Sequence, residues 1–191
     1  ALLMAITSMT ISYVWSNFTA LTEINAFSHR LLNVVWIFAI LANGISCIFW
    51  AKLYERLSFK TICSMMFITQ GLLIVVLEIS GKYSFCYVFS IIGLLFCEGF
   101  SYSVFPVFTM RFFGMRFCME LYGTLFWVYP FVNILTQIIK HTLVGLIGYE
   151  ITLALFLIPL SFGCYLCVSM AEQTNWKPSE DWIELKNKIM I

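Results

Sequence analysis

Residues 51–60 form a short charged segment between two long apolar runs. The segment holds Lys52, Glu55, Arg56 and Lys60, and there is no room for a soluble domain between the runs. An apolar run of about 20 residues is long enough to cross the roughly 30 Å hydrocarbon core of a bilayer as a helix. The segment is therefore predicted to be a tight turn that joins two membrane-spanning helices on one side of a membrane.

The composition favours an integral membrane protein. The chain is 61% hydrophobic and 11% charged, whereas a soluble domain carries about 25% charged residues. A water-soluble fold of this length cannot hide so much apolar surface, so the lipid bilayer is the first predicted partner. The net charge of +1 and the scattered cations indicate no nucleic-acid partner. Because no His and Cys cluster has metal-ligand spacing and no glycine-rich phosphate loop is present, no metal site or cofactor is predicted.

Six segments have the length and apolar character of a membrane-spanning helix. They are continuous runs, without the alternation expected of the roughly ten-residue strands of a β-barrel. The predicted fold class is an all-α membrane protein, a six-transmembrane-helix bundle over residues 1–170. A tail at residues 171–191 follows, either as a short amphipathic helix on the membrane surface or as a disordered segment. The predicted spans are about 1–20, 31–50, 61–79, 83–105, 121–143 and 150–170.

Lysine and arginine are distributed unequally between the two ends of the predicted helices. Eight lie on the side of residues 51–60, residues 106–120 and the tail, and three lie on the other side. Because cytoplasmic loops carry the excess of positive charge, we expect a multi-pass membrane protein with its C-terminus in the cytosol. The first residue, Ala1, already belongs to an apolar run with no basic region before it, unlike a signal peptide. We therefore expect the chain to be a fragment that begins in a helix or at its edge.

Two stretches resemble the major facilitator superfamily of transporters. Residues 51–60 read small-x-Leu-x-acid-Arg-x-small-x-Lys. This pattern is similar to the G-x-L-x-D-R-x-G-x-K/R loop that joins the second and third helices of each six-helix half. Phe105-Pro106, the stretch 111–114 and Tyr122-Gly123 are similar to a P…FG…YG pattern after the fourth helix of a C-terminal half. That pattern is typical of the monocarboxylate, oxalate/formate and nodulin-like branch, and Asn43-Gly44 fits the same branch.

The resemblance implies that the chain is half of a twelve-helix major facilitator fold and supplies helices seven to twelve. Its expected partner is an N-terminal six-helix half or a second subunit. The implied function is a secondary active transporter, a symporter or uniporter, that moves a small organic solute by alternating access, with or without proton coupling. The charged side chains around residues 51–60 and 106–120 are implied to form a gating loop. They are Glu55, Arg56, Lys60, Arg111 and Arg116.

One position departs from the anion-carrying members of that branch. Those members usually have an Arg four residues before the small residue that opens the charged segment, and Cys47 occupies this position. No other basic residue lies in the middle of a predicted span. A neutral or zwitterionic solute is therefore more compatible with this half than a carboxylate.

Glu98 is the clearest ionisable residue within the predicted spans, between Cys97 and Gly99. On insertion scales, an ionisable group at bilayer depth costs about 2.5–3.5 kcal/mol, and such groups usually face a cavity. Glu98 is interpreted either as a proton-coupling carboxylate or substrate ligand, or as a protonated side chain bonded to a neighbouring helix.

The fifth predicted span carries polar residues at helical spacing. They are Tyr122, Tyr129, Asn133, Gln137 and Lys140. Such a stripe faces a cavity or forms hydrogen bonds to other helices, and the resemblance implies the cavity. Pro130 lies within the stripe and predicts a kink, because proline removes a backbone hydrogen bond. With candidates from the first two spans, the predicted substrate-binding residues are Tyr13, Asn17, Trp36, Asn43, Glu98, Tyr129, Asn133 and Gln137.

Two other functions compete with transport as interpretations of the sequence. A transporter-derived receptor or scaffold without transport is compatible with Cys47 and with the shortage of central charges. An intramembrane enzyme that uses Glu98 and His141 is disfavoured, because the predicted topology places them near opposite membrane faces, beyond hydrogen-bond reach. No enzymatic activity is predicted.

Overall fold

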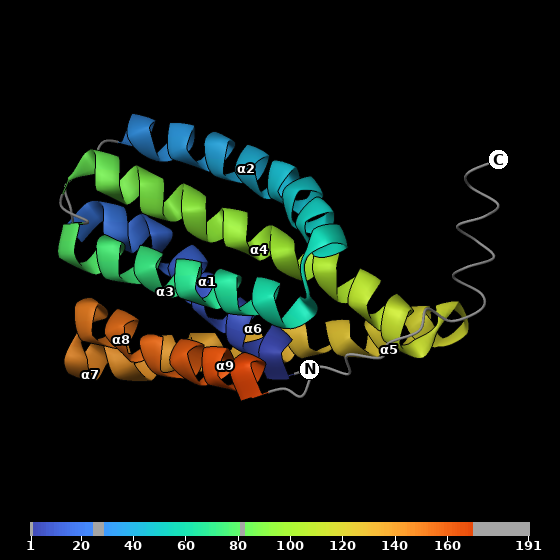
Figure 1. Ribbon diagram of the computed structural model, residues 1–191. Helices are drawn as coiled ribbons and strands as arrows, with labels where there is room; N and C mark the ends of the chain where they lie inside the picture. The colour runs from blue at the N-terminus through green and yellow to red at the C-terminus, as the bar shows by residue number, and fades with distance from the viewer. Residues whose placement is uncertain (1, 25–28, 81–82, 170–191) are drawn as a thin grey trace.

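The computed structural model describes residues 2–24, 29–80 and 83–169 (Figure 1). Within these ranges the side chains of residues 16–24, 29, 31, 32, 80, 112, 115, 116, 149 and 150 are not described. The described residues form helices joined by very short turns, so the all-α prediction is confirmed for this part of the chain. The predicted tail at 171–191 lies outside the described residues.

The helices join end to end into six rods. The first four rods are single helices, and the last two are interrupted. The first four are α1 (Leu2–Ile24), α2 (His29–Arg56), α3 (Phe59–Ser80) and α4 (Ser84–Phe113). The fifth rod consists of α5 (Met115–Phe126), α6 (Val128–Ile139), the π-helix η1 (Lys140–Val144) and α7 (Gly145–Ile147). The sixth consists of α8 (Tyr149–Leu155) and α9 (Leu157–Ser169).

Within the described residues, five helical stretches are long and apolar enough to cross a membrane. They are Asn33–Arg56, Phe59–Ile79, Ser84–Arg111, Phe117–Ile147 and Ile151–Ser169. These stretches indicate a multi-pass membrane protein that associates with a lipid bilayer, as predicted. The predicted first span falls on α1, whose apolar part with described side chains, Leu2–Trp15, is shorter. A sixth crossing therefore stays a prediction.

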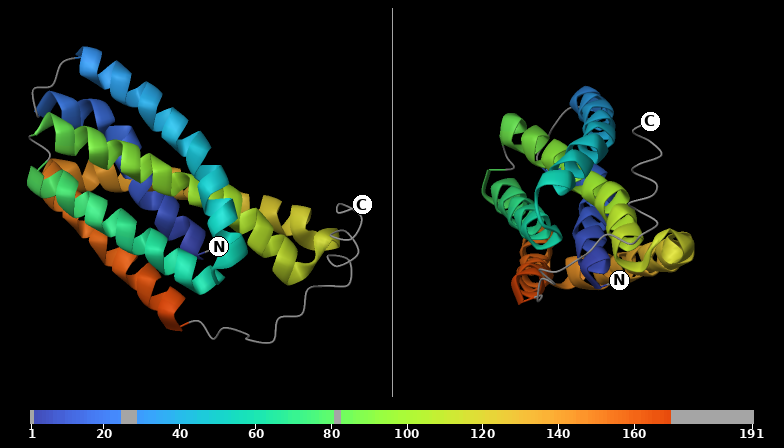
Figure 2. Two further views of the ribbon diagram at one scale, coloured as in Figure 1. Left: turned by 45° about the horizontal axis from the view of Figure 1, so that its top comes forward. Right: turned by 45° about the vertical axis from the view of Figure 1, so that its right-hand side comes forward.

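Helix α4 is the central element of the bundle. It packs against α1, α2, α3 and α5, while α3 also packs against α8 and α9, and α1 against α6 and α9 (Figures 1 and 2). In the most apolar part of α4, 56% of the residues are accordingly buried within the chain. The corresponding values are 22% for α2 and 11% for the fifth rod. These two elements therefore present most of their apolar surface to lipid or to another protein.

The charged segment at residues 51–60 is mostly helical. α2 continues to Arg56 and α3 begins at Phe59, so only Leu57 and Ser58 lie between the helices. The Ser58 hydroxyl accepts a hydrogen bond from the backbone N–H of Thr61 at 3.2 Å, which caps the start of α3. The turn is where the sequence predicts it, but it is shorter, because charged residues are tolerated in the last turn of a helix that reaches the headgroups.

Two glycines terminate helices in the second half of the chain. Gly114 separates α4 from α5 with φ +81°, and Gly148 separates α7 from α8 with φ +83°. Residues with a side chain rarely adopt this conformation. The predicted break at residues 106–120 is therefore a single residue, and Pro106 lies inside α4.

A proline follows one interruption in each of the last two rods. α5 and α6 are separated at Trp127, three residues before Pro130, and α8 and α9 are separated at Phe156, three residues before Pro159. A proline ring clashes with the carbonyl group four residues earlier, which disturbs the helix at that point. The sequence predicts a kink at Pro130, and the boundary between α5 and α6 lies at Trp127, three residues before this proline.

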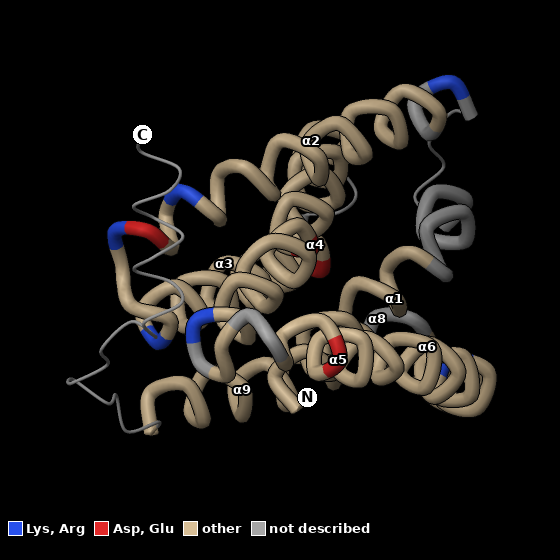
Figure 3. The backbone as a smooth tube through the Cα atoms, turned by 90° about the vertical axis from the view of Figure 1, so that its right-hand side faces the viewer, with Lys and Arg blue, Asp and Glu red and all other residues tan. Residues whose placement is uncertain are grey.

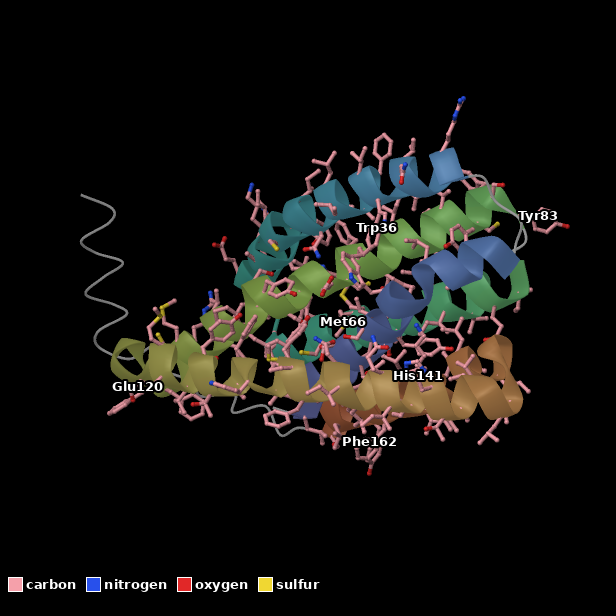
Figure 4. All side chains as sticks on the ribbon, turned by 180° about the vertical axis from the view of Figure 1, so that it is seen from behind. Trp36, Met66, Tyr83, Glu120, His141 and Phe162 are labelled. Atoms are coloured by element: carbon pink, nitrogen blue, oxygen red, sulfur yellow. The ribbon has the colours of Figure 1, made fainter. Side chains whose placement is uncertain are left out.

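Charged residues are sparse along the helices and gather mainly near their ends (Figure 3). The end of α2, the start of α3 and the end of α4 lie at the same end of the bundle (Figure 1). Lys52, Arg56, Lys60 and Arg111 therefore belong to this end, as the predicted topology requires. Glu120 lies towards it and Tyr83 lies at the opposite end (Figure 4).

Candidate functional site

Three helices supply hydrogen-bond donors to the carboxyl group of Glu98, which lies in the middle of α4. The Asn43 amide Nδ2 from α2 donates to Oε2 at 3.1 Å. The hydroxyl groups of Tyr102 and Tyr129 donate to Oε1 at 3.1 and 3.3 Å, from α4 and α6 respectively. Glu98, Asn43 and Tyr129, all predicted as site residues, are therefore brought together. Tyr102 was not predicted, although it follows Glu98 by four residues and so shares its helix face.

A close approach of α2 and α4 positions this site. A Cβ atom placed on Gly99 would lie only 2.9 Å from the backbone oxygen of Asn43, and it would also clash with the Ser46 side chain. Ser46 is buried, and its hydroxyl donates to the Asn43 backbone oxygen at 2.6 Å. Small residues at a helix contact allow two membrane helices to pack with their backbones close together. This packing lets the Asn43 side chain reach Glu98.

Trp50, seven residues after Asn43 on α2, forms a second contact between α2 and α4. Its indole Nε1 donates to the backbone oxygen of Phe96 at 3.0 Å, and its ring meets the ring of Phe100 edge-on at 5.7 Å. Trp50 and Phe100 are both buried. A buried indole N–H usually has a hydrogen-bond partner, and here that partner fixes the register of α2 on α4.

A cluster of aromatic rings adjoins the carboxyl group. The Tyr129 ring is stacked with the rings of Phe126 and Tyr102, at centroid distances of 5.4 and 5.9 Å. Phe126 also contacts the rings of Tyr102 at 6.4 Å and Tyr122 at 5.9 Å. These distances lie within the range of about 4.5–7 Å for favourable ring pairs. We call Tyr102, Tyr122, Phe126 and Tyr129 the ring cluster.

The ring cluster borders an apolar groove of about 510 Å³. Its lining residues are Tyr122, Gly123, Phe126, Trp127 and Pro130. A second hollow of about 480 Å³ lies further along the same rod. Its lining residues are Asn133, Ile134, Gln137, Ile138, His141 and Thr142. Both volumes are in the range of about 300–1,000 Å³ that small-molecule sites occupy.

Asn133 and Gln137, both predicted as site residues, line the second hollow. The side-chain oxygen of Asn133 also accepts a hydrogen bond from the Ser12 hydroxyl of α1. The sequence predicts that the polar stripe either faces a cavity or forms interhelical hydrogen bonds, and Asn133 does both. His141 lies in the π-helix η1 and lines the same hollow. Such π-helical turns occur often at functional sites, and no signal in the sequence predicted this one.

Tyr13 on α1 and Trp36 on α2 have aromatic partners elsewhere in the bundle. Tyr13 is fully buried, and its ring lies 4.6 Å from the Phe156 ring in the core. The rings of Trp15 and Trp36 meet edge-on at 4.1 Å, and Trp36 lies between α2 and the rest of the bundle (Figure 4). The side chain of Asn17 lies outside the described part of the structure.

Among the predicted gating residues, Arg111 is the one whose contacts to another helix are defined. Its Nη1 donates to the backbone oxygen of Tyr54 at 3.4 Å, and its guanidinium lies 4.5 Å from the centre of the Tyr54 ring. Glu55 and Arg56 are exposed at the end of α2, and Lys60 is half-buried in the first turn of α3. The side chain of Arg116 is not among those described. Tyr54 is a contact that the motif did not predict.

Comparison of the chain with protein families, curated proteins and solved structures found no match. The major facilitator resemblance therefore stays a prediction from the motifs. Within the described residues, no group of three or more His, Cys, Asp or Glu side chains is placed to hold a metal ion. The arrangement around Glu98 consists of one carboxyl group, three neutral hydrogen-bond donors and a wall of aromatic rings.

Proposed function

We propose that this chain is a six-helix half of a secondary active transporter of the major facilitator type, and that it moves a small organic solute by alternating access. One observation carries the proposal: in the middle of a candidate membrane span, Glu98 receives hydrogen bonds from Asn43 on α2 and Tyr129 on α6. An ionisable side chain at this depth is costly, and such side chains commonly mark solute or ion pathways.

The packing of the helices supports a site shared with a second bundle. α2 and the fifth rod flank Glu98, and only 22% and 11% of the residues in their most apolar parts are buried. In transporters built from two repeats, the solute site lies between the repeats near the bilayer midplane. We place the partner half, from the same or another chain, over these two elements.

The gating proposal rests on the contact between α2 and α4 near the basic end of the bundle. Arg111 from α4 binds the backbone and the ring of Tyr54 on α2. We propose that this contact holds the two helices together in one state of the transport cycle and is released in the other. The excess of Lys and Arg at this end supports a cytosolic placement of this end of the bundle. A protease-protection experiment on a C-terminal tag in sealed vesicles tests that orientation.

Uptake into proteoliposomes tests the transport proposal. The complete gene product is reconstituted, and uptake of radiolabelled amino acids, sugars, nucleosides and amines is measured with a pH dye inside the vesicles. We expect saturable uptake of at least one solute class, with a change of internal pH if protons are coupled. The variants Glu98→Gln and Asn43→Ala should lower that uptake about tenfold or more, corresponding to roughly 1.4 kcal/mol or more of lost stabilisation.

The matched control is Glu120→Gln, which neutralises an exposed carboxylate on α5 that takes no part in the three hydrogen bonds to Glu98. Its uptake should equal that of the unaltered protein. Absence of saturable uptake for every solute class, or equal uptake by Glu98→Gln, would contradict the proposal. In that case a receptor or scaffold derived from a transporter becomes the better interpretation.

A further inference from the structure

We propose that the site around Glu98 binds an organic cation, with an ammonium group beside the carboxylate and against the rings of Phe126 and Tyr102. This inference rests on the proposed function, because it names the substrate class of the proposed transporter. It is carried by the uncharged surroundings of the Glu98 carboxyl group, the ring cluster and the groove, and it can be tested by binding alone.

The first argument is the charge balance at Glu98. Three donors converge on its two oxygens, from Asn43, Tyr102 and Tyr129, which is the arrangement that suits an ionised carboxylate. In the described part of the chain, the groups that contact the carboxylate are all uncharged. A carboxylate removed from water is costly unless a cation pairs with it. The positive charge of a bound ligand supplies that pair.

The second argument is the aromatic wall. The faces of aromatic rings attract cations, and groups of rings recognise quaternary ammonium ions in particular. The Tyr102 and Phe126 side chains are 37% and 42% exposed, so a ligand can reach them, whereas Tyr129 behind them is 9% exposed. Tyr102 and Tyr129 both bond to Glu98 through their hydroxyl groups. The carboxyl group of Glu98 therefore lies beside two members of the ring cluster.

The third argument is the groove that begins at Phe126. Its five lining residues carry no charge, and its volume of about 510 Å³ leaves room for the apolar part of an amine. The ionisable side chains nearest the carboxylate, Cys47, Tyr102 and Tyr129, are neutral in their ordinary protonation state at neutral pH. No basic group in the described residues of this site would attract an anion. The sequence is compatible with a neutral or a zwitterionic solute. The geometry around Glu98 favours a solute that carries an ammonium group.

A pair of probes that differ in charge alone tests the inference. Choline and its uncharged isostere 3,3-dimethyl-1-butanol are titrated into the complete protein in lipid nanodiscs, and binding is followed by calorimetry. We expect saturable binding of choline and at least tenfold weaker binding of the alcohol. Equal binding of the two probes, or no binding of choline, would overturn the inference. This comparison needs no variant and so does not depend on whether a substituted protein folds.

Three variants locate the bound probe. Glu98→Gln should weaken choline binding at least tenfold. Phe126→Leu should weaken it roughly 2- to 30-fold, the range expected for loss of a cation–π contact. The control Phe131→Leu changes a ring on the exposed side of α6, where Phe131 is 67% exposed, and should bind choline like the unaltered protein. Equal choline binding by Glu98→Gln and the unaltered protein would overturn the assignment of the site.

Binding and transport separate the two proposals. Choline binding that Glu98→Gln abolishes, without uptake of any solute, supports this inference and contradicts the proposed transport. Saturable uptake of a neutral solute, without choline binding, supports transport and overturns the organic-cation site.

Discussion

Gly99 of α4 and Ser46 of α2 lie so close together that no side chain fits on Gly99. A Cβ atom there would overlap the Ser46 side chain and approach the Asn43 backbone oxygen to 2.9 Å. The same contact aligns the Asn43 amide with Glu98, one residue before Gly99. The packing of two helices and the geometry of the candidate site therefore depend on one small residue.

Gly99→Ala should destabilise the protein. The added methyl group forces α2 away from α4, and overpacking of this kind costs about 1–3 kcal/mol. Thermal unfolding of the detergent-solubilised protein measures the loss. The control is Gly44→Ala, because a Cβ atom on Gly44, in the same helix as Ser46, has no neighbour within 4 Å. Equal melting temperatures of Gly99→Ala and Gly44→Ala would show that the two helices are not in this contact.

Trp50→Phe should lower the unfolding free energy by about 0.5–1.5 kcal/mol. The substitution retains an aromatic ring between α2 and α4 but removes the indole N–H that donates to the Phe96 backbone oxygen. Trp127→Phe is the matched control, because the Trp127 side chain is 68% exposed and should tolerate the change. A larger effect of Trp127→Phe than of Trp50→Phe would refute the role assigned to this hydrogen bond.

Gln70→Leu should leave stability unchanged or raise it by up to about 1 kcal/mol. Gln70 is fully buried in α3, and its Nε2 donates to the Thr7 backbone oxygen at 3.2 Å. Among the described residues, its side-chain oxygen has no hydrogen-bond partner. An unpaired buried polar atom costs about 1–3 kcal/mol, more than an interhelical hydrogen bond typically returns in a membrane protein, about 0.6 kcal/mol.

The same thermal unfolding measurement applies to this variant. Gln137→Leu, an exposed amide on α6, serves as control for a general effect of greater hydrophobicity. A drop of more than about 1 kcal/mol in Gln70→Leu alone would indicate that the Gln70 oxygen has a partner, such as a buried water molecule.

The parts of the fold that follow from local physics were predictable. Length and apolar character locate the five candidate spans, and the cost of burying a carboxyl group singles out Glu98. Helical spacing also selects Tyr129, which lies against Glu98 in the structure. At residues 51–60, α2 ends later and α3 begins earlier than the predicted spans, because hydropathy marks the hydrocarbon boundary and helices continue beyond it.

Contacts between helices distant in sequence were not predictable from one helix at a time. Tyr13 shares a polar face with other α1 residues, yet α1 packs against several helices, and this face meets Phe156 in the core. A helix surrounded by neighbours has no single inner face that periodicity can identify. For the same reason the motif indicated Arg111 as a gating residue without indicating Tyr54 as its contact.

The contact between Arg111 and Tyr54 leads to the last prediction. Tyr54→Phe should destabilise less than Tyr54→Leu, because the backbone oxygen and the ring that Arg111 contacts both remain and only the hydroxyl group, which also interacts with Arg111, is lost. Tyr54→Leu removes the ring and should cost about 0.5–2 kcal/mol from the lost cation–π contact. Arg111→Lys should also destabilise, since an ammonium group lacks the planar fork that covers the ring while it donates to the backbone.

A double-mutant cycle of Tyr54→Leu and Arg111→Gln measures the coupling of the two side chains. We expect a coupling free energy of at least about 0.5 kcal/mol, since the two residues are in direct contact. Additive effects would refute the contact between α2 and α4 at this end. If the contact also gates transport, Arg111→Gln should change the accessibility of a cysteine placed beside the ring cluster. Lys52→Gln, which changes an exposed residue of α2 at the same end of the bundle, should not. The double-mutant cycle tests the contact itself. The accessibility of the introduced cysteine tests whether that contact controls access to Glu98.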